Sequence, residues 1–270
     1  MLLAPSENHR ILSTGTALGF LPVALVQSAR LRSDTLATPL PRGEPAGAVG
    51  DLSASTLDLL VVGDSSAVGG CCEDMDAALP PRLAYGVAMR LRRRVRWAAR
   101  GGAGWTAAKL DNELRRGGVP GADVALVLVG VNDAVALTPR ASWRRQMQRI
   151  VGRLFDAGAR LVVISGVPRM ERLPGLAWPL GPLLGLRARQ LDRVARELAR
   201  PAPIDPERTL VYAPVPSVDP TAHLAGDGVH ASAAGYAWWA ACLADVLARE
   251  YAQLPSQPAS AVDRSAAAGV

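Results

Sequence analysis

A serine suited to act as a nucleophile follows the first strongly apolar run of the chain. Residues 57–62 are apolar except for Asp58, and such a short run is typical of a strand buried on both faces of a parallel sheet. The run ends in Gly63, Asp64, Ser65 and Ser66, where the chain must turn sharply toward a helix. Ligand sites of α/β folds lie at the carboxyl ends of strands, so Ser65 would face substrate. The alternative is an ordinary strand-to-helix turn in which Asp64 or Ser65 is the N-cap.

A serine hydroxyl is a poor nucleophile at its ordinary pKa and needs a general base within hydrogen-bond reach. The chain has three histidines, His9, His223 and His230. His9 lies in the N-terminal tail, and His223 lies in an expected loop with no acid three residues before it, which favours a surface role. Asp227 precedes His230 by three residues and can reach its ring within a single turn. We therefore predict His230 as the base and Asp227 as the carboxylate that orients it.

Two further strand ends carry groups suited to binding an oxyanion. Residues 101–104 (Gly-Gly-Ala-Gly) follow a strand expected at 96–99, and residues 130–133 (Gly-Val-Asn-Asp) follow one expected at 122–129. In a parallel sheet these ends share one edge with Ser65, which brings together the parts needed for acyl transfer. Asn132 has the alternative role of a turn residue that caps the next helix. For Asp64 and Asp133 we expect hydrogen bonds within turns and loops.

Metal and cofactor sites are less favoured interpretations of the same residues. Asp64, Asp133, Asp227 and His230 could form a metal site, but a serine beside asparagine and glycine N–H groups suits an oxyanion better. The glycine loop lacks the Gly-x-x-x-x-Gly-Lys-Ser/Thr phosphate cradle and the Gly-x-Gly-x-x-Gly dinucleotide fingerprint. The Gly-x-Ser-x-Gly elbow of the ordinary α/β-hydrolases is also missing from the sequence. We therefore expect neither a cofactor nor a metal.

Taken in order, Gly-Asp-Ser, the glycine loop, Gly-x-Asn-Asp and Asp-x-x-His resemble the SGNH hydrolases, also called the GDSL esterase/lipase family. The resemblance extends from about residue 57 to the final helix. It implies Ser65 as nucleophile, His230 as general base and Asp227 as the residue that holds the imidazole. It also implies an oxyanion hole made of the backbone N–H groups of Ser65 and Gly104 and the side-chain amide of Asn132.

The rest of the chain alternates strands with helices, which predicts an α/β fold with helices on both faces of a parallel sheet. Strands are expected at 57–62, 96–99, 122–129, 159–165 and 209–214. Helices are expected at 80–95, 106–116, 139–154 and 184–198, with a final helix capped by Ser232. The resemblance implies a three-layer α/β/α sandwich around a mostly parallel, five-stranded, flavodoxin-like sheet. Residues 166–185 are expected to form a long proline-rich loop.

The chain divides into four expected parts. Residues 1–33 form an apolar N-terminal helix, 34–55 a Pro- and Gly-rich linker, 56–253 the hydrolase domain and 254–270 a disordered tail. Residues 11–29 carry no charge, and a packed or membrane-surface helix, a membrane anchor and a cleaved signal all remain open for them. We favour the first and expect a cytoplasmic protein that associates with a membrane surface, rather than a secreted one.

The charge and the cysteines make nucleic-acid binding and a zinc site less favoured interpretations. The net charge is +6, and Lys109 is the one lysine among many arginines. The dense cluster Arg92, Arg93, Arg94 and Arg96 has no interleaved aromatics to stack on bases, so a solvated helix face is favoured over nucleic-acid binding. Cys71, Cys72 and Cys242 show no zinc-like spacing and are expected to be reduced, structural thiols.

These observations predict a serine esterase or lipase-like enzyme that hydrolyses carboxylic esters through an acyl-enzyme. Its partner would be a small-molecule ester with an apolar acyl group, because residues 167–184 are largely apolar and would form the acyl pocket or a lid. An acyltransferase using the same Ser65 and His230 is one alternative. A non-catalytic binding module at a membrane surface is the other.

Overall fold

A computed structural model describes residues 21–200 and 207–255 of the chain, and its centre is a six-stranded sheet with the order β1-β3-β2-β4-β5-β6. The strands are β1 (Ala46–Val49), β2 (Thr56–Gly63), β3 (Arg94–Gly101), β4 (Val124–Leu128), β5 (Leu161–Ser165) and β6 (Thr209–Ala213). The five strands β3, β2, β4, β5 and β6 pair in parallel with their neighbours, as predicted. The sixth, β1, lies antiparallel to β3 at the edge of the sheet.

Strand β1 comes from residues 34–55, for which the sequence predicts a linker. Its four residues are flanked by prolines and glycines, so they carry too little apolar pattern to indicate a strand. The pairing depends on β3: the N–H of Ala99 donates to the carbonyl of Pro45 over 2.7 Å, and Gly47 lies against the ring of Trp97. A linker-like composition therefore extends the sheet here, because an edge strand needs only a partner backbone.

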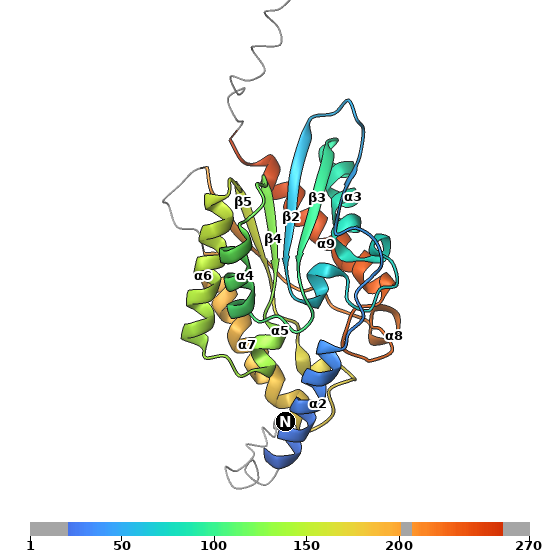
Figure 1. Ribbon diagram of the computed structural model, residues 1–270, viewed down its shortest axis with the longest axis vertical. Helices are drawn as coiled ribbons and strands as arrows, with labels where there is room; N and C mark the ends of the chain where they lie inside the picture. The colour runs from blue at the N-terminus through green and yellow to red at the C-terminus, as the bar shows by residue number, and fades with distance from the viewer. Residues whose placement is uncertain (1–20, 201–206, 256–270) are drawn as a thin grey trace, which may run out of the picture.

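Helices cover both faces of the sheet, which confirms the predicted three layers (Figure 1). One face carries α3 (Leu79–Leu91) and α9 (Ala233–Ala252), and the other carries α4 (Ala107–Gly117), α6 (Arg140–Asp156) and α7 (Leu180–Leu198). Side chains of β2 alternate between them: Leu59 and Val61 pack in the α3–α9 core, and Leu60 and Val62 in the α4–α6–α7 core. Both cores meet at β2, so the turn that follows it is held from two sides.

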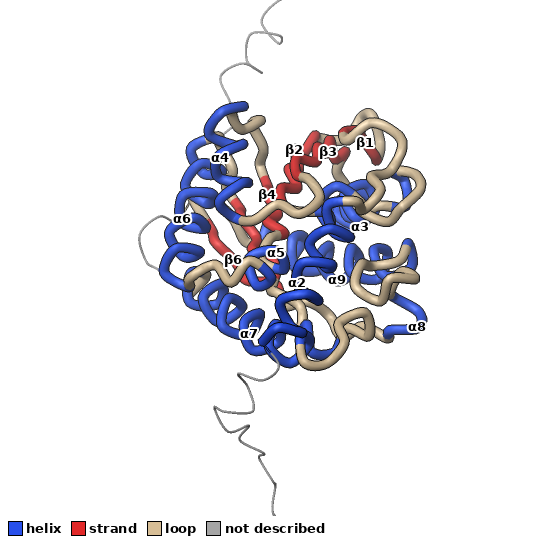
Figure 2. The backbone as a smooth tube through the Cα atoms, turned by 60° about the horizontal axis from the view of Figure 1, so that its bottom comes forward, coloured by secondary structure: helices blue, strands red, loops and turns tan. Residues whose placement is uncertain are grey.

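Several short elements follow the carboxyl ends of the strands, among them α5 (Val131–Val135) and α8 (Pro220–His223) (Figure 2). The others are η1 (Ser65–Val68), η2 (Met75–Ala77) and η3 (Met170–Arg172). The long helix α2 (Leu21–Leu36) lies beside α5 and α7 at the same end (Figures 1 and 2). Within the described residues, none of the helices combines the length and hydropathy needed to cross a membrane.

Element boundaries differ from the expected ones where a local conformation ends a helix early. Helix α3 stops at Leu91 rather than at 95, because Arg92 adopts a left-handed conformation with φ of +51° and caps it. Strand β3 is accordingly longer than the expected 96–99. The expected loop 166–185 contains η3 and the start of α7 at Leu180. The segment 1–20, most of the expected tail 254–270 and residues 201–206 lie outside the described residues.

Candidate active site

Ser65 begins the 3-10 helix η1 directly after β2, at a turn that is built into the sheet. The N–H of Asp64 donates to the carbonyl of Leu128 in β4 over 2.9 Å. A Cβ on Gly63 would lie 1.9 Å from the same carbonyl oxygen, so this position requires glycine. Ser65 is only 5% exposed. The neighbouring strand therefore fixes the backbone that carries its hydroxyl.

Asp64 is the N-cap of η1. This agrees with the alternative interpretation of the turn, in which Asp64 or Ser65 caps the helix. Its Oδ1 accepts the N–H of Ser66 over 3.0 Å, so the cap uses Asp64 and not the hydroxyl of Ser65. Burial raises the pKa of Asp64 to about 6, against the lowering effect of the Ser66 N–H and of the nearby His230. The capping role and the predicted nucleophile are thus compatible, because different residues carry them.

Hydrogen bonds join the two segments predicted to bind an oxyanion, the glycine loop after β3 and the turn after β4. Asn132 lies in α5 and its Nδ2 donates across to the carbonyl of Trp105 over 3.1 Å, rather than capping a helix. Asp133 is fully buried, and its Oδ2 accepts the N–H of Ala107, the first residue of α4, over 2.9 Å. This confirms the expected loop-holding role of Asp133. The turn after β4 and the glycine loop after β3 are therefore held in a fixed relation.

Gly104 adopts φ of +73°, a conformation that favours glycine. A Cβ there would lie 2.7 Å from Cδ2 of Leu36, so the end of α2 packs directly on the glycine loop. Helix α2 therefore lies close to the site, although its sequence contains none of the motifs identified above.

Asp227 and His230 lie on the loop between α8 and α9 and are hydrogen-bonded to each other. Oδ2 of Asp227 is 2.5 Å from Nδ1 of His230, and Oδ1 accepts the N–H groups of Val229 and His230 over 2.9 and 3.0 Å. Burial opposes ionisation of Asp227, but these hydrogen bonds and the His230 ring outweigh it and lower its pKa. The Asp227 side chain is 42% exposed and that of His230 10%. The carboxylate is thus ionised at neutral pH and aimed at the ring.

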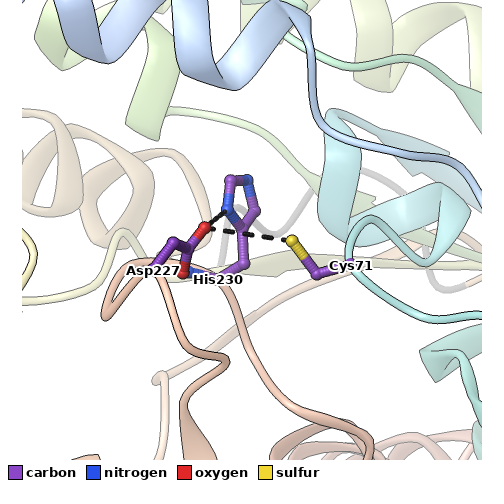
Figure 3. Close-up of side chains that lie close together, drawn as sticks. All are labelled: Cys71, Asp227 and His230. Carbon is purple, nitrogen blue, oxygen red and sulfur yellow. Dashed lines mark hydrogen bonds and ion pairs between the residues drawn. The ribbon is translucent and has the colours of Figure 1, made fainter.

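Cys71 lies beside this pair, which the sequence analysis did not predict (Figure 3). Its Sγ is 3.9 Å from Oδ2 of Asp227, and its backbone has φ of +69°. Burial and the charge of Asp227 raise the pKa of the Cys71 thiol to about 11. One ligand atom each of Cys71, Asp227 and His230 lies within 4.8 Å of the others. No local motif links Cys71 to Asp227, because they are 156 residues apart and meet only in the fold.

A cavity of about 560 Å³ brings three of the predicted site residues together. Ser65, Asn132 and His230 all line it, so segments far apart in sequence converge at this edge of the sheet. Gly104 and Asp227 are not among the residues that line it, but Asp227 contacts the lining residue His230. The wall is mostly apolar. Its lining includes Leu31, Leu128, Val135, Val167, Met170 and Leu173.

The cavity wall draws on one expected segment and one unexpected one. From the expected acyl-pocket loop, Val167, Met170 and Leu173 line it, whereas Trp178 of the same loop is exposed on the surface. Helix α2 contributes Leu31 and Thr35. Since α2 lies upstream of every motif, only the tertiary structure could reveal this contribution.

His223 also lines the cavity but is held differently from His230. Its Nδ1 accepts the N–H of Asp219 over 3.1 Å, and its ring stacks on Trp238 with centroids 5.9 Å apart. The Asp219 carboxylate instead accepts the N–H and hydroxyl of Thr221. His223 therefore lacks the carboxylate partner that His230 has.

Comparisons with known proteins indicate a family and a fold for this chain. Residues 61–238 match the model of the GDSL-like Lipase/Acylhydrolase family. A GDSL-like esterase of Mycobacterium tuberculosis is 27% identical over 184 residues, which is 66% of this chain and 58% of that protein. The chain thus spans somewhat more than half the length of this curated relative.

Solved structures with the same fold include two enzymes. A family 3 carbohydrate esterase of Clostridium thermocellum superposes with a TM-score of 0.52 at 16% identity, covering 73% of this chain and 100% of that one. LAE5, an alpha/beta hydrolase enzyme from the metagenome of Lake Arreo in Spain, gives 0.50 at 16% identity, covering 75% and 98%. At such identities the similarity concerns the fold.

Proposed function

We propose that this chain, which belongs to the GDSL-like lipase/acylhydrolase family, hydrolyses carboxylic esters through an acyl-enzyme formed on Ser65. The observation that carries the proposal is the shared cavity, whose wall includes Ser65, Asn132 and His230. The 2.5 Å contact between Asp227 Oδ2 and His230 Nδ1 supports His230 as a general base whose ring is oriented by the carboxylate. Family membership supports ester hydrolysis as the reaction type.

In the proposed mechanism, Ser65 Oγ attacks the ester carbonyl while Nε2 of His230 takes the hydroxyl proton. Asp227 accepts the hydrogen bond from Nδ1, which keeps the proton on that nitrogen and leaves Nε2 free to act as the base. His230 then gives its proton to the leaving alcohol. Water attacks the acyl-enzyme in the second half of the reaction, with His230 again as base, and releases the acid.

The tetrahedral oxyanion would be held by the backbone N–H groups of Ser65 and Gly104 and by Nδ2 of Asn132. The amide of Asn132 has two N–H groups, and Trp105 accepts one of them, so the other is available to an oxyanion. The bond to Trp105 would keep the amide from rotating away. Preorganised donors of this kind need no rearrangement when charge develops.

The apolar wall supports an ester with an apolar acyl group. A cavity of 560 Å³ is within the range for small-molecule sites, and Val167, Met170 and Leu173 make one side of it apolar. Rates on p-nitrophenyl esters of increasing acyl length should therefore rise from acetyl to longer chains. A preference for acetyl alone would contradict the apolar acyl group without affecting the hydrolase assignment.

The central test is labelling by a fluorophosphonate probe, which reacts with activated serine hydroxyls. Wild type should be labelled on Ser65 and should hydrolyse p-nitrophenyl esters, and Ser65→Ala should lose both properties. Ser66→Ala is the matched control, because it removes the adjacent hydroxyl and keeps the backbone N–H that donates to the capping carboxylate of Asp64. Unlabelled wild type would support a non-catalytic module, and product formed only with an added acyl acceptor would support an acyltransferase.

We also propose that the protein is cytoplasmic and rests on a membrane surface through the segment that includes α2. Val23 and Val26 of this helix are exposed, and Trp178 is exposed next to Gln27, whose Nε2 donates to its carbonyl over 3.2 Å. Exposed apolar side chains near Arg30 suit the surface of an anionic bilayer. Cosedimentation with anionic vesicles should fall in Val23→Ser/Val26→Ser, and equal cosedimentation of both proteins would refute this role for α2.

A further inference from the structure

Cys71, Asp227 and His230 form a cluster whose chemistry differs from that of the proposed ester hydrolysis. The three side chains come from the turn after η1 and from the loop before α9, and they point toward one another (Figure 3). Sγ of Cys71 is 3.9 Å and Nδ1 of His230 is 2.5 Å from Oδ2 of Asp227. Ester hydrolysis uses two of these groups and leaves the thiol without a part in it.

We propose that these three side chains bind a zinc ion and that the bound ion switches the esterase off. A thiolate, a carboxylate and an imidazole are the three side-chain ligand types that Zn²⁺ uses in proteins. Because Zn–ligand bonds are about 2.0–2.3 Å long, ligand atoms of one tetrahedral site lie roughly 3.3–3.7 Å apart. The three atoms here already lie within 4.8 Å of one another. To reach that geometry, Nδ1 and Oδ2 must move apart from 2.5 Å, and Sγ must approach Oδ2 from 3.9 Å.

The surroundings of the cluster allow a cation to enter and be neutralised. The Asp227 side chain is 42% exposed, which leaves a path from solvent to the ligand atoms. A thiolate and a carboxylate together balance the two positive charges of the ion. With three protein ligands, a water molecule can complete the tetrahedron. Hard cations such as Mg²⁺ prefer oxygen ligands in octahedral geometry and do not suit this donor set.

Zinc on Nδ1 of His230 would remove the base by changing the tautomer of the ring. In ester hydrolysis Nδ1 carries a proton and donates it to Asp227, so Nε2 is free to accept the proton of Ser65. When zinc occupies Nδ1, that proton moves to Nε2 through solvent, and the Cys71 thiol releases its proton to water as the Zn–S bond forms. A ring protonated on Nε2 cannot take a proton from the serine hydroxyl.

The inhibition rests on the proposed function, whereas the binding of zinc does not. The experiment therefore measures both on the full-length chain, first freed of metal with a chelator. Bound zinc is measured by equilibrium dialysis, and the esterase rate is measured against free Zn²⁺ as a fraction of each protein's own uninhibited rate. Ser65→Ala is included for binding alone, so a failure of the hydrolase proposal leaves the zinc site testable.

Wild type and Ser65→Ala should each bind one more zinc ion per chain than Cys71→Ala does. Zinc should inhibit wild type and a chelator should restore the rate, while Mg²⁺ at the same concentration should have no effect. Cys71→Ala should need at least about tenfold more zinc for the same fractional inhibition, since it lacks one of three ligands. Cys71→Gly should behave alike and suits the φ of +69° at this position, which guards against a folding defect.

Cys242→Ala is the matched control, because it removes a half-buried thiol of α9. It should bind and respond to zinc as wild type does. Equal zinc binding by wild type and both Cys71 variants would overturn the proposed site. Zinc bound through Cys71 with an undiminished esterase rate would overturn the inhibition.

Discussion

Ser65 and His230 reach the same cavity from two regions of the molecule that are built differently. Ser65 follows a central strand, is 5% exposed, and sits on a backbone that adjoins Leu128 of the neighbouring strand. His230 lies on a loop outside the sheet, where the Asp227 side chain is 42% exposed. Hydrogen bonds within four residues of the chain hold the two loop residues together.

Because the two regions are built differently, substitutions in them should affect stability and activity to different extents. The turn that carries Ser65 is part of the core, so changes there act on the free energy of unfolding as well as on the reaction. Asp227 and His230 themselves belong to neither hydrophobic core, so substitutions of these two residues should act mainly on the reaction. A substitution that moves the two quantities together in the loop would show that this division is wrong.

In the loop, a large loss of activity is expected from Asp227→Asn. The amide can still accept the N–H groups of Val229 and His230 through its oxygen, but its nitrogen then faces Nδ1 and favours the wrong tautomer of the ring. We expect kcat to fall by about 10⁴, as for a misoriented triad base. The free energy of unfolding should change by less than about 1 kcal/mol, because the side chain is partly exposed.

Steady-state kinetics on a p-nitrophenyl ester and urea unfolding of the same preparations check this prediction. His230→Gln should match Asp227→Asn in kinetics and in stability. If Asp227→Asn kept a tenth or more of the wild-type kcat, the carboxylate would not be the group that orients the base.

A smaller loss is expected from Asn132→Ala, at the boundary between core and cavity. Removing one oxyanion donor should lower kcat by about 10²–10³ and leave KM nearly unchanged. The loss of the hydrogen bond to Trp105 should also lower stability by roughly 1 kcal/mol. Asn112→Ala is the control: its side chain accepts a hydrogen bond from Arg115 and does not line the cavity, so kcat and KM should stay unchanged. A change in KM without a change in kcat would assign Asn132 to substrate binding instead.

Continuous apolar runs made the centre of the fold predictable from sequence. The runs that became β2, β4 and β5 could be recognised because strands buried on both faces carry apolar side chains in both directions. Strand β1 escaped recognition because its four residues, flanked by prolines and glycines, carry too little apolar pattern to indicate a strand. The short helices α5 and α8 escaped it too, since four or five residues carry no periodicity.

The convergence of residues on one cavity was predictable where they lie in local motifs and unpredictable where they do not. Ser65, Asn132 and His230 each belong to a short pattern that ends or follows a strand, and the topology of a parallel sheet brings those ends to one edge. Cys71 and Leu31 belong to no pattern. Their positions beside Asp227 and on the cavity wall follow from packing between segments distant in sequence, which periodicity and spacing do not encode.

On the core side, Asp64→Asn should change stability in a pH-dependent way. Burial raises the pKa of Asp64 from 3.8 to about 6, so between these values the folded protein keeps a proton that the unfolded chain has lost. The stability of wild type therefore falls as pH rises through this window, by up to about 3 kcal/mol. The substitution leaves Asn132 and His230 in place, and the amide oxygen of the new side chain can still accept the N–H of Ser66 and so retain the cap.

Urea unfolding at pH 4.5 and pH 7.5 checks the sign. The variant should gain stability relative to wild type at the higher pH. Asp51→Asn is a surface control: hydrogen bonds from Ser53 lower the pKa of Asp51, so its effect on stability changes below pH 3.8 and should be nearly the same at pH 4.5 and pH 7.5. A difference between Asp64→Asn and wild type that stays constant with pH would show that Asp64 does not titrate in this range.

The smallest effect is expected from His223→Gln, which tests whether the loop holds one base or two. His223 lines the cavity, but its Nδ1 is taken by the N–H of Asp219 and its ring lies stacked on Trp238. Because Nδ1 accepts an N–H, the neutral ring carries its proton on Nε2, and that nitrogen cannot act as the base. We expect kcat/KM to change by less than about threefold on a p-nitrophenyl ester, against the loss of about 10⁴ for His230→Gln. A loss of similar size in both variants would mean that the base is not defined by its pairing with Asp227, and the contrast between the rigid turn of Ser65 and the self-supported loop of His230 would then no longer explain which residues act.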